Sequence, residues 1–298
     1  MPGPIVVLGS VNMDLVLRCP RLPAAGETLH GHDFRSVPGG KGANQAVAAA
    51  RLGGAVHFIG CVGDDAFGRE ARAALQAEGI GTTHLHTVAG HATGIAMIFV
   101  DAAGRNCIGL SGGANDALGI AEVDAAAGLI AGAALLVCQL ETPLAVVQHA
   151  IALARRSGVP VLLNPAPAQA LPADLAPRVD WLVPNQPEAA LLAGLADSDD
   201  AAEAARRLAA AGYRTVIVTV GEQGVSGIDA GRPFAFRAPR VRPVDTTGAG
   251  DTFVGALAVA IGEGLALADA VAFAQRAAAI SVTREGAMAS MPRRDELN

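Results

Sequence analysis

The chain has 298 residues, of which 51% are hydrophobic and only 3% aromatic, enough to bury a full core of small aliphatic side chains. Its net charge is −6 with no basic run, which argues against nucleic acid and anionic membranes as partners. The longest apolar stretch, 125–140, is too short for a membrane span, and the N-terminal MPGPIVVLGS lacks signal-peptide features. We therefore expect a cytoplasmic protein whose partners are small molecules.

Short apolar runs alternate with Ala-rich helical patterns along most of the chain. In order, we expect strands at 5–8, 134–138, 159–163, 181–183 and 215–220, and helices at 43–52, 66–77, 144–156, 201–211 and 252–261. This alternation predicts an α/β fold with a mainly parallel central sheet. Ligands of such sheets bind where the strands end, so polar residues directly after strands are the first candidates for a site.

Two segments, roughly 11–38 and 93–112, interrupt this alternation, and the second is typical of a hairpin that turns at 102–104. We expect them to form a small, discontinuous β lid beside one α/β domain that spans 1–298. A lid at this edge would exclude water from a reacting group.

The strongest local pattern is DTTGAGDTF at 245–253, directly before a helix. Gly248, Ala249 and Gly250 predict an anion-binding turn, because flexible backbone N–H groups and the helix N-terminus both favour negative charge. Asp251 at that helix start is the candidate general base. Taken alone, the same aspartate is also typical of a simple helix cap.

The second pattern is GGKGAN, where Gly40 permits close approach of the backbone and Lys41 and Asn44 offer polar groups suited to sugar hydroxyls. Asn12 and Asp14 follow the first strand and project to the same side, although such an N-x-D is usually a turn. Lys41 precedes glycine rather than Ser or Thr, which disfavours a Walker-type NTPase, and no G-x-G-x-x-G follows the first strand.

With GGKGAN and DTTGAGD in this order, together with GSVNMD, QLETPL, NPAPA, PNQPEA and TVGEQG, the chain resembles the phosphofructokinase-B, or ribokinase-like, family of sugar and nucleoside kinases from end to end. The resemblance implies a three-layer α/β/α sandwich with a small β-sheet lid. It also implies a sugar kinase that transfers phosphate from ATP to the 5-hydroxyl of D-ribose, giving ribose 5-phosphate and ADP.

The resemblance also assigns roles to residues. It implies a sugar site at Asn12, Asp14, Gly40, Lys41, Asn44, Glu141 and Asp251, and an anion hole at Gly248, Ala249 and Gly250. The ATP site would fall on Asn185, Glu188, Thr219, Gly221, Gly224, Gly250 and Gln275, with Asn185 and Glu188 organising Mg²⁺ and phosphate. A K⁺ site would fall on Asp245, Thr247, Ser281, Arg284, Gly286 and Ser290, several of them through backbone carbonyls.

Gln275 stands where relatives often carry Asn or His against the adenine, and Met13 lies between the two first sugar contacts. A kinase for deoxyribose, another sugar or a nucleoside is the alternative within the enzyme class. A non-catalytic sugar sensor on the same fold is the alternative outside it. The resemblance further implies a homodimer joined through the β lid.

Overall fold

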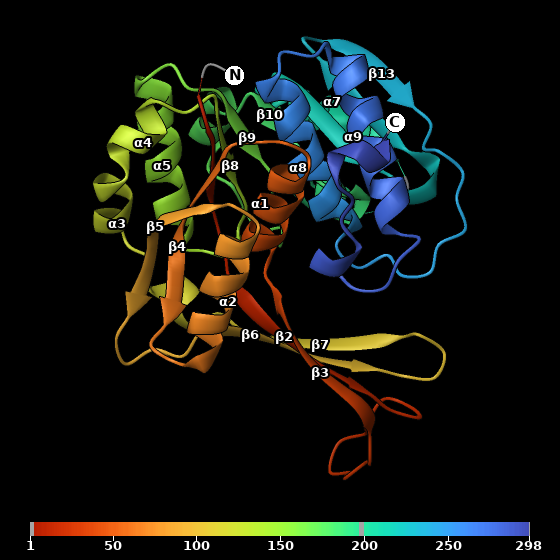
Figure 1. Cartoon of the computed structure of the whole chain (residues 1–298). Coiled ribbons are helices and arrows are strands. Elements are labelled where there is room, and N and C mark those ends of the chain that lie inside the picture. Colours follow the sequence, from red (N-terminus) through yellow and green to blue (C-terminus); the bar gives the residue numbers. More distant parts are fainter. Residues whose placement is uncertain (1–2, 197–199, 298) are drawn as a thin grey trace.

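The computed structural model describes residues 3–196 and 200–297, which form a large and a small β-sheet (Figure 1). The large sheet runs in the order β13-β12-β11-β10-β9-β8-β1-β4-β5. Its strands are β1 (Ile5–Leu8), β4 (Val56–Gly63), β5 (Gly81–Val88), β8 (Leu135–Cys138), β9 (Val161–Leu163), β10 (Trp181–Leu182), β11 (Thr215–Thr219), β12 (Val225–Asp229) and β13 (Arg232–Phe236). All pairs from β11 to β5 are parallel, and only the β12 and β13 pairings are antiparallel. The prediction of a mainly parallel sheet is confirmed.

Helices cover both faces of this sheet, so the three-layer sandwich is also confirmed. They are α1 (Lys41–Arg51), α2 (Ala66–Ala77), α3 (Ile120–Ala125), α4 (Ala127–Ala131), α5 (Leu144–Arg156), α6 (Gln186–Leu192), α7 (Ala201–Ala210), α8 (Ala249–Gly262) and α9 (Leu267–Ser281). Side chains alternate between the faces, as strand geometry requires: Ile5 and Val7 pack in one buried cluster with α1, α2, α8 and α9, whereas Val6 and Leu8 pack in a second with α3 to α7. Within residues 3–196 and 200–297, no helix is long and apolar enough to span a membrane.

Two helices begin earlier than the sequence patterns indicate. We expected α1 from Ala43 and α8 from Thr252, but they start at Lys41 and Ala249. Each start directly follows a glycine with positive φ, Gly40 (92°) and Gly248 (73°), a conformation that glycine adopts without steric cost. Lys41 and Asp251 therefore lie in the first turns of these helices.

The small sheet has the order β3-β2-β6-β7 and lies at one end of the large sheet (Figure 1). Its strands, β2 (Asn12–Arg18), β3 (His32–Gly39), β6 (Gly94–Val100) and β7 (Asn106–Ser111), come from the two segments that interrupt the βα alternation. β2 pairs with β6 in parallel, and the two outer pairs are antiparallel. Register partners share a face, so Val37, Asp14, Ala96 and Leu110 form one row across this sheet.

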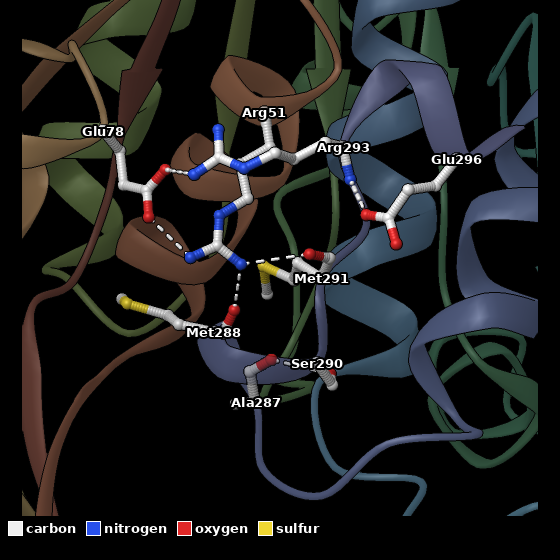
Figure 2. Close-up of polar contacts among 8 residues, drawn as sticks. All are labelled: Arg51, Glu78, Ala287, Met288, Ser290, Met291, Arg293 and Glu296. Atoms are coloured by element: carbon white, nitrogen blue, oxygen red, sulfur yellow. Dashed lines mark hydrogen bonds and ion pairs between the residues drawn. The ribbon is translucent and has the colours of Figure 1, made fainter.

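The far end of α1 is tied to the C-terminal segment by Arg51 (Figure 2). Its Nη1 donates to the carbonyl oxygens of Met288 at 2.5 Å and Met291 at 3.0 Å, and its Nη2 lies 2.5 Å from Oε1 of Glu78. The hydrogen bond from Arg51 lowers the pKa of Glu78 and keeps that carboxylate charged. One guanidinium therefore holds together α1, the end of α2 and the segment 288–291.

Replacing Arg51 with methionine should lower the free energy of unfolding by about 2–3 kcal/mol, because the change removes three hydrogen bonds at once and leaves the mostly buried Glu78 carboxylate with only the more distant Arg293, at 3.7 Å. Chemical denaturation would measure this loss. Arg178→Met is the matched control, since Arg178 and Asp174 form an ion pair with side chains 44% and 63% exposed, against 15% and 18% for Arg51 and Glu78. The control should cost less than about 1 kcal/mol, and equal losses in the two variants would contradict this role of Arg51.

Candidate active site

Asp251 lies in the first turn of α8 and is held by two neighbouring residues of α1. Asn44 Nδ2 donates to its Oδ2 at 2.9 Å, and Gln45 Nε2 donates to its Oδ1 at 3.0 Å. Burial raises the pKa of Asp251 above its usual range, while the Lys41 ammonium and the two amide donors oppose that rise. A buried carboxylate with a raised pKa and one donor on each oxygen is well suited to accept a proton.

Four further charged side chains lie within electrostatic reach of this carboxylate. Burial raises the pKa of Asp14 to about 6, and the negative charges of Glu141 and Asp251 add to that rise. Burial alone would lower the pKa of Lys41, but Asp251, Glu141 and Glu188 outweigh it and raise that pKa. Lys41 is therefore a charged ammonium among acidic groups that come from four separate parts of the chain.

Glu141 contacts the start of α1 rather than the helix that follows it in sequence. Its Oε2 accepts from the Ser10 hydroxyl at 2.6 Å and from the backbone N–H of Lys41 at 3.1 Å. The Ser10 hydroxyl in turn accepts from the N–H of Gly42 at 3.3 Å. A carboxylate at a helix N-terminus is stabilised by the unpaired N–H groups there, so Glu141 and Ser10 together cap α1.

Glycines allow α1 to begin this close to β1 and β2. A Cβ on Gly40 would lie 2.8 Å from Asn12 N, and one on Gly42 would lie 2.6 Å from Ser10 N. A Cβ on Gly39 would lie 2.4 Å from a carboxylate oxygen of Asp14. The close approach places the start of α1 directly against Ser10, Asn12 and Asp14.

The turn before α8 presents backbone donors beside Asp251. The first intrahelical bond runs from the Thr252 N–H to the Gly248 carbonyl at 2.8 Å, so the N–H groups of Gly250 and Asp251 precede the helical ladder. Gly250 is exposed, with no atom near the position of a Cβ. The N–H of Ala249 donates to the Thr246 carbonyl at 3.2 Å, so one of the three amides expected in the anion hole is used by the turn itself.

Asn185 and Glu188 bind each other at the start of α6. Asn185 Oδ1 accepts from the Glu188 N–H at 2.9 Å, and Glu188 Oε2 accepts from the Asn185 N–H at 2.8 Å, which is a capping box. Burial raises the pKa of Glu188, and the charge of Asp251 adds to that rise, while the Asn185 N–H and Lys41 oppose it. Glu188 is thus within electrostatic reach of the cluster around Asp251.

The remaining residues expected at the nucleotide gather beside β11 and β13. Thr219 forms a bridge with Asn185, and Gly221 and Gly224 bound the turn that follows β11. A Cβ on Gly224 would lie 2.1 Å from the Phe236 carbonyl oxygen, which also accepts from Gln275 Nε2 at 3.0 Å. The Gln275 side chain is therefore buried against the end of β13 through its amide nitrogen.

Among the residues expected at the cation, three lie in direct contact. Asp245 Oδ1 accepts from the Thr247 N–H and hydroxyl at 2.9 and 2.7 Å, and Asp245 Oδ2 accepts from the Gly286 N–H at 2.9 Å. Burial would raise the pKa of Asp245, but these bonds and the positive charge of Arg18 outweigh it and lower that pKa. An ionised carboxylate among hydroxyl and carbonyl oxygens fits a hard monovalent cation.

The other three candidate cation ligands lie on the adjoining segment but use their side chains differently. The hydroxyls of Ser281 and Ser290 donate to the carbonyls of Ala278 and Ala287 at 2.9 and 2.8 Å, and Arg284 forms an ion pair with Glu296. The serine hydroxyl oxygens and the backbone carbonyls of these residues keep lone pairs for a cation, whereas the Arg284 side chain offers none.

Several buried polar residues of the site have no role in the sequence patterns. Asn115 donates to Asn12 Oδ1 at 2.8 Å and bonds to both backbone groups of Val11. A cavity of about 280 Å³ lies beside this contact, and its lining includes Asn12, Asn115 and Glu141 but not Asp251. Ser10 lies within the GSVNMD motif, yet its bond to Glu141 joins residues 131 positions apart, so spacing alone could not reveal it.

Comparison with known proteins identifies the family to which the chain is similar. The family model for pfkB family carbohydrate kinases matches residues 4–294. The chain is 44% identical over 294 residues to a ribokinase of Haemophilus influenzae, covering 98% of this chain and 96% of that protein. It is 40% identical over 301 residues to a deoxyribokinase of Salmonella typhimurium, covering 99% and 97%.

The fold also matches a solved structure along its whole length. Arabidopsis thaliana ribokinase, complexed with ribose and ATP, superposes with a TM-score of 0.93 at 33% identity, covering 100% of this chain and 98% of that one. The match of the family model, the full-length similarity and the shared fold agree. The chain therefore belongs to the pfkB family of carbohydrate kinases.

Proposed function

We propose that the protein phosphorylates D-ribose at its 5-hydroxyl with ATP, giving ribose 5-phosphate and ADP. The observation that carries the chemistry is Asp251, a buried carboxylate at the start of α8 that accepts one amide donor on each oxygen. The choice of ribose rests on full-length similarity to ribokinases, one of which has been solved with ribose and ATP.

In this proposal Asp251 is the general base. It takes the proton of the sugar 5-hydroxyl as that oxygen bonds to the γ-phosphorus, and the bond from phosphorus to the β,γ-bridging oxygen breaks to release ADP. The anion-hole turn of Gly248, Ala249 and Gly250 would face the negative charge of the transferring group with the N-terminal dipole of α8 and with N–H donors other than that of Ala249, which bonds to Thr246 within the turn. Asn12, Asp14, Gly40, Lys41, Asn44 and Glu141 hold the sugar so that its hydroxyl meets Asp251.

The nucleotide would bind along Asn185, Thr219, Gly221, Gly224 and Gln275. Gln275 Nε2 donates one hydrogen to the Phe236 carbonyl, so its amide oxygen and its second N–H hydrogen would be the groups left for a base. Glu188, with one carboxylate oxygen on the α6 cap, would hold Mg²⁺ together with the phosphates, a mode typical of a metal that keeps several water ligands. Bound Mg²⁺ neutralises phosphate charge during transfer.

K⁺ would bind at Asp245 and Thr247 with backbone oxygens of Ser281, Arg284, Gly286 and Ser290. Gly248 supports this placement, because a Cβ there would lie 3.0 Å from Ala287 Cα, so the segment 286–290 packs directly on the anion-hole turn. A cation that orders this segment would order the turn as well.

The small sheet would act as the lid of this site and as the interface of a homodimer. Asp14 sits in its row with Val37 and Leu110, which ties the sheet to the sugar site. Val37, Ile108 and Leu110 share one face of this sheet by register and expose 40%, 52% and 60% of their surface, an apolar surface of the kind that pairs with a second copy.

Deoxyribose is the second candidate substrate, because the similarity to a deoxyribokinase is nearly as high as that to ribokinases. A nucleoside kinase and a non-catalytic sugar sensor are the remaining alternatives. An intact base and anion-hole turn favour catalysis over sensing.

The first expected result is ADP release from Mg-ATP that is fastest with ribose and is stimulated by K⁺. The assay compares ribose, deoxyribose, fructose and adenosine, with K⁺ or with a bulky organic cation at equal ionic strength. A faster rate with another acceptor would overturn the choice of ribose, equal rates with both cations would overturn the K⁺ site, and no turnover would favour the sensor.

Asp251→Asn should lower kcat by a factor of about 10² to 10⁴, because the amide cannot take the hydroxyl proton. Ribose binding, measured by calorimetry, should survive, since asparagine keeps the shape of the side chain. Asp269→Asn is the control, because Asp269 is exposed on α9 and its change should leave kcat as it is. Unchanged turnover in Asp251→Asn would refute the assignment of the base.

Asp14→Asn should stabilise the ligand-free protein while weakening ribose binding. A carboxyl whose pKa is raised to about 6 in the folded state destabilises that state above pH 6, and the penalty disappears below its unfolded pKa near 4. The gain in unfolding free energy should therefore be about 2–3 kcal/mol at pH 7.5 and close to zero at pH 4. Thermal unfolding at both pH values measures it, and an equal effect at the two would contradict the raised pKa.

A further inference from the structure

Gln45 is a fully buried glutamine at the centre of an amide network behind Asp251. Its Nε2 donates to Asp251 Oδ1 at 3.0 Å and to Asn164 Oδ1 at 2.9 Å, and its Oε1 accepts from Gln139 Nε2 at 2.6 Å. Gln45 and Gln139 are 0% exposed. Gln45 therefore touches Asp251 but offers no surface to a substrate.

The partners of Gln45 fix which way its amide points. Asn164 Nδ2 donates to the Val183 carbonyl at 2.8 Å, so Asn164 turns its oxygen toward Gln45. Gln139 presents its nitrogen to Oε1 of Gln45. Both hydrogens of Gln45 Nε2 and its oxygen are thus used, and a flipped amide would set oxygen against the oxygens of Asn164 and Asp251.

The packing of α1 on α8 sets the distance between Gln45 and Asp251. Asp251 and Gly255 are four residues apart and lie on the same face of α8. A Cβ on Gly255 would lie 2.6 Å from the Gln45 carbonyl oxygen and 2.6 Å from Ala48 Cβ. The two helices are therefore in backbone contact one turn from the carboxylate.

We propose that Gln45 is a positioning residue for Asp251 in the phosphoryl transfer. Asn44 and Gln45 each bind one carboxylate oxygen, so rotation of the carboxylate about its Cβ–Cγ bond breaks both hydrogen bonds. Asn44 is also expected to contact the sugar, whereas Gln45 acts only through Asp251. The network fixes the plane of the base and leaves a lone pair on its oxygens for the sugar hydroxyl. This inference rests on the proposed function.

The test is Gln45→Met, which keeps the length of the side chain and removes both donors and the acceptor. We expect kcat with ribose to fall by about 10- to 100-fold, with KM for ribose and ATP within about threefold of wild type. Because the lost hydrogen bond favours the ionised carboxylate, the acidic limb of the kcat profile should move up by about one pH unit. The charged groups near Asp251 are Lys41, Asp14, Glu141 and Glu188, and the substitution keeps all four.

A readout without turnover separates this inference from the proposed function. The pH titration of the Asp251 carboxyl carbon, followed by ¹³C NMR and assigned by its loss in Asp251→Asn, should show a higher midpoint in Gln45→Met than in wild type. If wild type phosphorylates no acceptor while this midpoint still rises, the proposed function fails and the contact role of Gln45 stands. An unchanged midpoint and an unchanged kcat in folded Gln45→Met would overturn the inference.

Two further variants complete the design. Gln76→Met is the matched control, because Gln76 on α2 donates only to the Thr82 hydroxyl at 3.0 Å in an exposed contact, and it should leave kcat and its pH profile unchanged. Gln139→Met tests the same network if Gln45→Met does not fold. It frees the Gln45 oxygen without touching Asp251, so the acidic limb should move in the same direction by a smaller amount, and no movement would contradict the proposal.

Discussion

A carboxylate buried between α1 and α8 is the constraint on which the site depends. An ionised carboxylate away from water is costly unless donors and an opposite charge compensate for it. Here the donors come from Asn44 and Gln45, and the opposite charge from Lys41. The first turn of α1 is therefore polar on its buried side, whereas the following turns of that helix are mostly buried alanines that let α8 approach.

The same site concentrates more negative charge than one lysine can neutralise. Asp14, Glu188 and Asp251 all have a raised pKa, with burial as the main cause. Such a site is strained without ligands, because the acids lack enough donors of their own. In the proposed function, the sugar hydroxyls would donate to these acids and a metal ion would neutralise part of their charge, so the site would give up stability in the free protein in return for ligand binding.

Features carried by one continuous stretch of chain are predictable from the sequence. The apolar runs around Ile5 and Val216 lie in buried parallel strands as expected, and DTTGAGD forms a turn followed by a helix. The pattern Asn185-Gln-Pro-Glu188 is also local, and as a capping box it was open to recognition from spacing alone.

The features of the site that could not be predicted from the sequence are contacts between residues far apart in the chain. Gln45 bonds to Asp251 across 206 positions and Asn115 bonds to Asn12 across 103, and an amide has no spacing rule that signals such a partner. Glu141 illustrates the same limit, because its place after β8 suggests a cap for the next helix, whereas the fold turns it toward α1. Which helix start a carboxylate reaches depends on strand order, here β8 beside β1.

Helix α1 is held by hydrogen bonds at both ends. Its first turn bonds to the carboxylates of Glu141 and Asp251. At its last residue, Arg51 bonds to the carbonyls of Met288 and Met291. The eleven residues of α1 span about 16 Å, and a hydrogen-bonded helix transmits displacement along its axis with little compression. A ligand that displaced the first turn would therefore also act on the C-terminal segment that packs on Gly248. By thermodynamic reciprocity, any such coupling would be equal in both directions, so an ion that orders the segment would change the affinity of the first turn by the factor with which the ligand changes the affinity for the ion.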